Sequence, residues 1–436
     1  MMVILTMWVD AAFAMIPPSP APGWSQTTSL PNYYYQQSLV YWNGFLYQAG
    51  GVSSGNGNGS CGDVLYAQVQ TNLNMVVWTT NSTYGGLSYS IVNNLVGTWN
   101  ATTPLPDAVG YPAGVAANGF LYVLSGAIDS EGPYANNSVY YAKINPDGSV
   151  GAWQTTTPLP SPEFGLNAVV WNGRIYTTGG NNGLYMTNAV WSAQIQTNGS
   201  LSSWVAQAPL PETVEFHASV VANGYIYVLG GSVNSCWTNS VYYSRINANG
   251  TLAGWNQTTP LPVGLSEFGA VVAGGQVIVM AGVSSGGPIN ELSSAALAGD
   301  GSLGTWTNLL TWTGTSFYPP PSDTWAFGMA VADNYVFVAG GTKTGEEGTP
   351  NVFTMALPLP PTPPTLSLQR SQTNKSVQLN LTSTTNTGFG LLASTNLTTW
   401  TNIGWGFTDT NGSLLLQDTN SAQFPRRFYR AYWPLP

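Results

Sequence analysis

The nine residues "NGYIYVLGG" at positions 223–231 decide the fold, because close variants of them recur along the chain. The variants begin at Asn43 (NGFLYQAGG), Asn118 (NGFLYVLSG), Asn172 (NGRIYTTGG), Gly274 (GGQVIVMAG) and Asp333 (DNYVFVAGG). Asn-Gly supplies the two positive-φ positions of a tight hairpin turn, and the apolar run after it is typical of a buried strand. The terminal glycines allow backbones to approach closely. The sequence therefore predicts six similar hairpins.

A tryptophan marks the same repeat. It follows a glycine-rich turn, precedes a PLP-type tripeptide, and stands at positions 24, 99, 153, 204, 255 and 306. The last three steps are 51 residues each, and a period near 50 indicates propeller blades. Each unit reads as four strands with two hairpin turns and no helical period. The longer first step of 75 residues places an insertion near residues 70–93 of the first unit.

Counting the strands predicts a closed ring. There are six hairpins and six Trp strands, and the first Trp strand, from Trp24 to Pro31, precedes the first complete unit. We expect this N-terminal strand to complete the sixth blade, which removes two exposed sheet edges. The prediction is an all-β chain in which residues 15–357 form a six-bladed β-propeller closed by an N-terminal strand.

Residues 24–357 resemble kelch-repeat propellers, which share the glycine pair after the second strand, a Tyr-bearing third strand and a tryptophan. The chain departs from that pattern where Ser125-Gly126 and Ala281-Gly282 replace the glycine pair. The resemblance implies the propeller fold and points to no particular kelch subfamily.

The C-terminal part changes its pattern. Residues 358–364 are a proline-rich stiff spacer, and residues 365–436 contain five or so short strands expected to form a small β-sandwich domain. The stretches "ASTNLTTWTNIG" and "DTNGSLLLQDTNSAQFPRRFYRA" resemble modules at the C-termini of exported bacterial proteins. Five of the nine basic residues lie there: Arg370, Lys375, Arg426, Arg427 and Arg430.

The first residues favour export. Residues 1–14 resemble a signal-peptide remnant that ends in Ala12-Phe13-Ala14, an A-x-A cleavage pattern. No segment has the length of a transmembrane helix, so we expect no membrane span. Secretion or display on the cell surface is the predicted location. Eleven N-x-S/T sequons are candidate glycosylation sites: Asn58, Asn81, Asn100, Asn136, Asn198, Asn249, Asn256, Asn374, Asn380, Asn396 and Asn411.

The composition limits the partners. Charged residues make up 6% of the chain and its net charge is −9, against roughly a quarter charged in an average domain. Nucleic acid is excluded as a partner, because few cations are present to neutralise phosphates. Low charge density also favours association between copies.

Carboxylates and aromatic residues recur in the loops of one predicted face. The loop after the PLP-type tripeptide contributes an acid in five units, and the loops after the glycine pairs add aromatic residues. The candidate ligand-binding residues are Asp107, Glu163, Glu215 (with Glu212 as its alternative), Glu267, Asp323, His217, Tyr34 and Trp237. Such a face suits a cation, an amine or a sugar. The alternative is that the carboxylates accept hydrogen bonds from loop backbone.

No catalytic arrangement emerges from the sequence. His217 is the only histidine, which excludes a multi-histidine metal site or copper oxidase chemistry, and we expect it to be a satisfied strand-end residue. A sialidase-type arginine cluster is excluded, since the predicted blades offer only Arg174 and Arg245. Both G-x-S-x-G matches lack a following helix. We therefore expect no cofactor and no catalytic residues, and we leave the pairing of Cys61 and Cys236 open.

Two functions remain compatible with these residues. The first is an exported, non-enzymatic structural or adhesion protein that self-assembles through uncharged polar and aromatic surfaces, with other copies, cell-surface proteins or glycans as partners. The alternative is a carbohydrate-binding or carbohydrate-active propeller that uses the acidic face, including a glycosidase-like pair of carboxylates.

Overall fold

A computed structural model describes residues 24–53, 59–70, 74–81, 86–93, 95–128, 134–234, 236–289, 292–308, 324–332, 335–343, 348–356, 365–370, 376–382, 388–395, 401–407, 413–424 and 426–432. The predicted signal segment 1–14, the spacer 358–364 and the candidate Asp323 lie outside these residues.

Six four-stranded antiparallel sheets dominate the described chain. From the innermost strand outward, the first sheet contains β3 (Ser38–Trp42), β4 (Phe45–Ala49), β7 (Val64–Gln68) and β10 (Asn100–Ala101). The second contains β11 (Ala113–Ala117), β12 (Phe120–Ala127), β13 (Ala135–Lys143) and β14 (Gln154–Thr155), and the third contains β15 (Asn167–Trp171), β16 (Arg174–Thr178), β17 (Val190–Gln194) and β18 (Val205–Ala206).

The other three sheets repeat this order. The fourth contains β19 (Ala218–Ala222), β20 (Tyr225–Leu229), β23 (Val241–Arg245) and β24 (Asn256–Gln257). The fifth contains β25 (Gly269–Ala273), β26 (Gln276–Met280), β29 (Leu292–Ala296) and β30 (Thr307–Asn308). The sixth contains β32 (Gly328–Ala332), β33 (Tyr335–Ala339), β35 (Val352–Ala356) and β1 (Trp24–Thr27).

The inner strands form a closed circle. Each inner strand contacts the next in the order β3, β11, β15, β19, β25 and β32, and β32 contacts β3 again. β1 lies at the outer edge of the sixth sheet, where Gln26 is paired with Phe353 of β35. The first described strand, β1, therefore shares a sheet with the last strands of the ring, β32, β33 and β35. This is the arrangement that the count of Trp strands predicts.

A belt of backbone hydrogen bonds surrounds the axis of this circle. Its members stand two positions before the inner strands and all have positive φ: Gln36, Tyr111, Gly165, Phe216, Glu267 and Ala326, with φ between 52° and 62°. The N–H of Gln36 donates to Ala326 O at 2.6 Å, and the N–H of Ala326 donates to Glu267 O at 3.0 Å. The N–H groups of Glu267, Phe216 and Tyr111 donate to Phe216, Gly165 and Gln36 in the same way. The left-handed conformation thus links neighbouring sheets.

The repeated tryptophans join the sheets at the outside. The indole Nε1 of five of the six donates to a backbone carbonyl just after the outer strand of the preceding sheet, at 2.8–3.1 Å. The pairs are Trp99 with Thr28, Trp153 with Thr103, Trp204 with Thr157, Trp255 with Ala208, and Trp306 with Thr259. A half-buried indole needs a partner for its single donor, and the same bond recurs at these five junctions between sheets.

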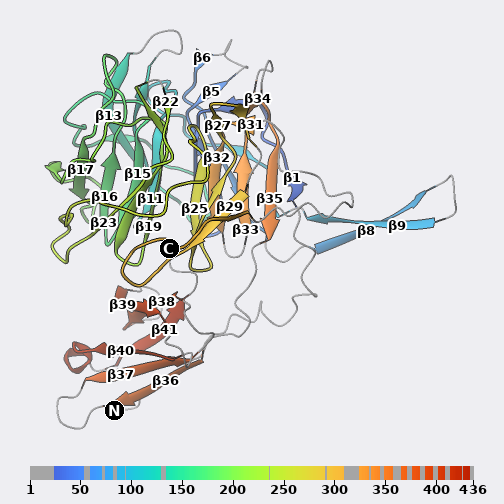
Figure 1. Ribbon diagram of the computed structural model, residues 1–436. Coiled ribbons are helices and arrows are strands. Elements are labelled where there is room, and N and C mark those ends of the chain that lie inside the picture. Colours follow the sequence, from blue (N-terminus) through green and yellow to red (C-terminus); the bar gives the residue numbers. More distant parts are fainter. Residues whose placement is uncertain are drawn as a thin grey trace.

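The insertion of the first unit is a separate hairpin. Strands β8 (Asn74–Asn81) and β9 (Gly86–Asn93) pair with each other as a two-stranded antiparallel sheet. Figure 1 shows this hairpin projecting sideways from the ring of sheets.

Short strands gather at one end of the ring, the top in Figure 1. They are β2 (Tyr34–Tyr35), β5 (Val52–Ser53), β6 (Gly59–Ser60), β21 (Ser232–Val233), β22 (Cys236–Trp237), β27 (Val283–Ser284), β28 (Gly287–Pro288), β31 (Thr324–Trp325) and β34 (Thr342–Lys343). We call this end the upper face. It consists of the loops that precede each inner strand and the loops that follow each second strand.

The C-terminal module, residues 365–432, contains two three-stranded antiparallel sheets and a short 3₁₀ turn, η3 (Ser421–Gln423). One sheet has β36 (Thr365–Arg370), β37 (Val377–Thr382) and β40 (Ser413–Asp418), and the other has β38 (Gly388–Ser394), β39 (Thr401–Phe407) and β41 (Phe428–Tyr432). Leu379 of the first sheet and Leu391 and Tyr429 of the second share one buried core. The two sheets therefore bury their apolar faces together.

The module meets the ring at the end opposite to the upper face (Figure 1). A Cβ at Gly224 would lie 3.2 Å from Trp405 Cζ2, so the Trp405 ring of β39 rests on the Asn223-Gly224 turn. Trp405 also packs against the apolar core that contains Ile226 and Val228. In the described part of the chain, no helix is long and apolar enough to cross a membrane.

The candidate glycosylation sites differ in exposure. Asn100, Asn198, Asn249 and Asn256 are exposed. Asn136 is buried at 8% exposure, and its Oδ1 accepts from the N–H of Ser138 at 3.1 Å. A glycan does not fit there, so the prediction at Asn136 is wrong. Asn58, Asn374, Asn396 and Asn411 lie outside the described residues.

Candidate functional site

The belt brings polar side chains together at the centre of the upper face. Gln36 Nε2 lies 3.5 Å from Glu267 Oε2, across the small Ala326 that separates them in the belt. Burial raises the pKa of Glu267, the Gln36 amide opposes the rise, and the charge of Glu215 adds to it. Burial, followed by the charge of Glu267, raises the pKa of Tyr111 to about 12. Gln36 and Tyr111 are site residues that the sequence interpretation missed.

Three aromatic rings lie beside these polar groups. The ring centroids of Tyr111 and Phe216 are 5.2 Å apart, those of Tyr111 and Phe164 are 5.8 Å apart, and those of Phe164 and Phe216 are 6.1 Å apart. All three pairs are tilted, with interplanar angles of 47–54°, and their separations lie within the range of about 4.5–7 Å at which aromatic pairs attract. The signal that could have found Tyr111 and Phe216 is their constant offset, two residues before an inner strand.

Glu163 is buried, and its hydrogen bonds hold the loop that contains it. It is 1% exposed, and its Oε1 accepts from the Ser161 hydroxyl at 2.8 Å. The Ser125 hydroxyl donates to the Glu163 backbone carbonyl, and the Glu163 N–H donates to Asn136 O at 2.9 Å. Burial raises the pKa of Glu163 to about 7. Its proposed role as a ligand-facing carboxylate is therefore wrong.

Glu215 and Asp107 are also tied to neighbouring loops. Glu215 is 9% exposed, and its Oε2 accepts from Asn181 Nδ2 at 2.8 Å. Burial raises the pKa of Glu215, and the Asn181 amide opposes this rise. The Tyr140 hydroxyl donates to the half-buried Asp107 carboxylate. These contacts fit the alternative in which the carboxylates organise loops.

Tyr34 and His217 are both buried. The Tyr34 hydroxyl donates to Asp63 Oδ2 at 2.8 Å, and the side chain is 1% exposed, so it is not available to a ligand as predicted. His217 Nε2 is hydrogen-bonded to Thr178 Oγ1 at 2.8 Å. Burial lowers the pKa of His217 to about 3, so the ring is neutral at ordinary pH. His217 belongs to the packing between the third and fourth sheets rather than to an exposed site.

The two cysteines are not paired. Cys61 is buried and Cys236 is exposed, and both are free thiols. Burial raises the pKa of Cys61 to about 12, so this thiol is protonated. Within the described residues, no group of three or more His, Cys, Asp or Glu side chains is arranged to hold a metal ion.

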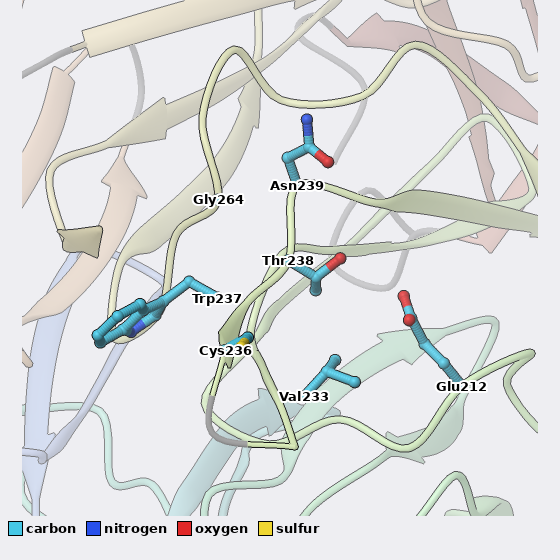
Figure 2. A pocket seen from close by; sticks show the side chains of 7 residues that line it. All are labelled: Glu212, Val233, Cys236, Trp237, Thr238, Asn239 and Gly264. Carbon is cyan, nitrogen blue, oxygen red and sulfur yellow. The ribbon is translucent and has the colours of Figure 1, made fainter. Parts of the chain in front are cut away.

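A pocket of about 330 Å³ opens on the upper face beside β22. Its lining comprises Glu212, Val233, Cys236, Trp237, Thr238, Asn239 and Gly264. Figure 2 shows the carboxylate of Glu212 on one side, with the indole of Trp237 directed away from it. Of the two acids proposed for this loop, Glu212 lines the pocket, and the predicted Trp237 is 41% exposed at its rim.

Exposed apolar side chains are concentrated on the same face. Nine large apolar side chains of the described chain are exposed. Seven of them lie in upper-face loops: Tyr33, Ile128, Tyr134, Leu184, Tyr185, Trp237 and Val263, with exposures from 39% to 87%. The other two are Val205 in β18 and Leu415 in β40. Since single exposed apolar residues are normally scattered, their concentration around one face indicates an interaction surface.

Comparison with known proteins agrees with this architecture. Residues 113–349 match the family model described as the KLHDC2/KLHL20/DRC7 Kelch-repeats domain. The chain belongs to this kelch-repeat family. The kelch resemblance and the all-β propeller class predicted from the sequence are thereby confirmed.

Several kelch proteins align with parts of the chain. Kelch-like protein 41a of Danio rerio is 25% identical over 182 residues, which cover 39% of this chain and 28% of that protein. Kelch-like protein terF of Aspergillus terreus is 24% identical over 284 residues, covering 62% and 57%. Beta-scruin of Limulus polyphemus is 30% identical over 146 residues, covering 32% and 15%. The kelch-repeat chain thus spans less than two thirds of each of these relatives.

A solved structure shows the same fold. The protein titled "Structure of YjhT" superimposes with a TM-score of 0.53 at 15% identity, covering 81% of this chain and 99% of that one. At this identity the likeness supports the propeller fold of the kelch-repeat chain and nothing about its chemistry.

Proposed function

We propose that this kelch-repeat chain is a non-enzymatic protein that binds other proteins through its upper face. In this proposal each of the six four-stranded sheets is one blade of a six-bladed propeller, and residues 365–436 form a β-sandwich carried by it. We further propose, from the export signal predicted in residues 1–14, that the protein acts at the cell surface or outside the cell as a structural or adhesion protein.

The gathering of seven exposed apolar side chains on one face carries the proposal. They include three tyrosines and a tryptophan, residue types enriched at protein interfaces. Leu184 and Tyr185, at 87% and 65% exposure, project from the loop between β16 and β17. Burying such side chains against a partner is favourable by roughly 25 cal/mol for each Å² of apolar surface.

The acidic residues of the face give less support to the carbohydrate alternative. Glu163 and Glu215 are buried and are engaged by Ser161 and Asn181. A glycosidase needs two carboxylates that reach opposite sides of a glycosidic bond. The remaining support for a sugar site is the pocket that contains Glu212, Thr238 and Asn239, which equally suits the polar rim of a protein interface.

Photo-crosslinking in the producing cells tests the proposal. A photoreactive amino acid is placed at Tyr185 or Tyr134 on the upper face, and at Val205 on the outer strand β18 as the control. Val205 is 50% exposed, so its accessibility is comparable. We expect covalent adducts with protein at the two tyrosine positions and none at Val205. Leu184→Ser should abolish the Tyr185 adduct, whereas Val205→Ser should not. Equal adducts at all positions, or none, would contradict protein binding by this face.

A further inference from the structure

We infer that the pocket beside β22 binds an arginine side chain of the partner protein, with the Glu212 carboxylate as its counter-ion. The inference rests on the proposed protein-binding function and names the chemical group that this function recognises. It starts from Glu212, because the described part of the chain supplies no cation to this carboxylate.

The upper face as a whole is acidic. Within the described residues, its loops contain six carboxylates and one lysine position, Lys343 in β34. None of the described basic residues forms an ion pair with Glu212. A face of one sign attracts a partner of the opposite sign. The carboxylates are Asp63, Asp107, Glu163, Glu212, Glu215 and Glu267.

The inner side of Glu212 is held by its own sheet. Glu212 encloses a small internal space together with Leu210, Val228 and Tyr242. Burial raises the pKa of Tyr242, and the charge of Glu212 and a hydrogen bond from the Tyr242 hydroxyl to this carboxylate add to the rise. A carboxylate has about four lone-pair sites, and a neutral phenol leaves its charge uncompensated. The half-buried Glu212 therefore still presents an acceptor to the pocket.

The other polar groups of the pocket also act as acceptors. Figure 2 shows Thr238 and Asn239 across the pocket from the Glu212 carboxylate. The Thr238 hydroxyl donates to Ser240 Oγ at 3.0 Å, so its proton is already used. Asn239 Nδ2 donates to Leu261 O at 3.1 Å, and its amide oxygen lies on the side of Glu212 (Figure 2). The pocket thus suits a cation that carries several donors.

A guanidinium group meets these requirements. It has five N–H donors in a planar fork and no acceptor, so it can bond to Glu212 and reach a second oxygen at the same time. The ammonium of lysine has three donors and is more strongly hydrated. The volume of about 330 Å³ is larger than a guanidinium group with its methylene stem, and Val233 provides an apolar wall for that stem.

The second sheet provides a matched control. Asp107 stands two residues after Leu105, as Glu212 stands two residues after Leu210. The Tyr140 hydroxyl donates to the Asp107 carboxylate, which parallels the contact of Glu212 in the fourth sheet. One wall of the pocket comes from the β21–β22 hairpin of that fourth sheet. Asp107→Asn therefore removes an equivalent charge without changing the pocket.

The Cys236 thiol reports on occupation of the pocket. Cys236 lines the pocket and is exposed, whereas Cys61 is buried and its thiol is protonated, so a maleimide should modify Cys236 selectively. We expect Nα-acetyl-arginine amide, added to the full chain, to slow this reaction in a saturable way, because the bound side chain covers the thiol. Nα-acetyl-citrulline amide, which has nearly the same shape and no charge, should leave the rate unchanged. Nα-acetyl-lysine amide should protect more weakly.

Two variants assign the effect to Glu212. Glu212→Gln retains an acceptor for the Tyr242 hydroxyl but loses the charge, so the concentration for half-maximal protection should rise roughly tenfold or more. Asp107→Asn should leave that concentration unchanged. Equal melting temperatures of the two variants would show that both are folded. In the producing cells, Glu212→Gln should also reduce the yield of the Tyr185 adduct, whereas Asp107→Asn should not.

The inference is overturned if the arginine compound gives no protection, or if the citrulline compound protects equally. Equal effects of Glu212→Gln and Asp107→Asn would also overturn it. Tyr185 adducts that persist at full yield in Glu212→Gln would leave the proposed protein-binding function standing without this pocket. Absence of Tyr185 adducts in the wild-type chain would instead contradict the function itself, so the two failures are distinguishable.

Discussion

At the scale of single residues, the two members of the glycine pair have different requirements. The first members have φ between 52° and 66°, and Ser125 and Ala281 occupy this position in two sheets. The second members have φ between 97° and 115° and are glycine in all six sheets. The first conformation lies in or near the small left-handed region that other residues visit, whereas the second lies outside it. This explains why the pattern departs from Gly-Gly at its first position only.

Matched substitutions at residues 281 and 282 test this difference. Gly282→Ala should lower the free energy of unfolding by at least about 2 kcal/mol, because the backbone is strained and the new Cβ would lie 2.6 Å from Phe268 Cβ. Ala281→Gly should change it by about 1 kcal/mol or less, since relief of strain offsets the lost methyl group. Urea denaturation measures both, and equal losses would contradict the explanation.

At the scale of elements, β1 closes the ring by covering the edge of β35. Its residues are paired from Trp24 with Met355 to Thr27 with Val352. Thr27 Oγ1 also accepts from the Val96 N–H at 3.1 Å, which connects the strand to the first sheet. One short strand therefore joins the two ends of the circle, and its loss exposes an unpaired edge.

Removing β1 should weaken closure without removing any inner strand. We expect a chain that begins at Thr28 to have a melting temperature several degrees below that of a chain that begins at Trp24, and to aggregate on heating, because β35 becomes an open edge. A synthetic peptide of residues 22–31 should recover part of the loss. Differential scanning calorimetry with and without the peptide decides this, and identical melting of the two chains would contradict a closing role.

At the scale of the whole molecule, burial of carboxylates on one face couples stability to pH. Burial raises the pKa of Glu163 to about 7 and also raises those of Glu215 and Glu267. The folded state thus binds more protons than the unfolded state between the ordinary carboxyl pKa and the raised one. Stability is then greatest at the acidic end of this window and falls as pH rises through it.

The free energy of unfolding should therefore fall between about pH 5 and pH 8, with Glu163 contributing up to roughly 3 kcal/mol. Glu163→Gln, which retains an acceptor for the Ser161 hydroxyl, should reduce this slope and leave the part due to Glu215 and Glu267. Denaturation curves at several pH values for both proteins measure the difference. Parallel pH profiles for the two proteins would show that burial does not raise the pKa of Glu163.

The repeat, the six hairpins and the Trp strands could be predicted because each has a local cause. Asn43, Asn118, Asn172 and Asn223 adopt the positive φ that their Asn-Gly turns require. A proline also stands five residues after four of the repeated tryptophans, at positions 99, 153, 204 and 255. The burial of Glu163 and Tyr34 could not be predicted in this way. Both looked like exposed loop residues, yet both are buried. Tyr34 bonds to Asp63 of another loop, and the Glu163 backbone is held by Ser125 and Asn136 of the second sheet.

The sequence by itself therefore determined the strands, their order in each sheet and the kelch-repeat character, because turn residues and apolar alternation act within a few positions. Only the tertiary structure decided which upper-face residues stay exposed, that Gln36, Tyr111 and Glu267 meet across the belt, and that Trp405 sets the module on the opposite end. Those outcomes depend on closure of the ring, which places residues hundreds of positions apart within hydrogen-bonding distance.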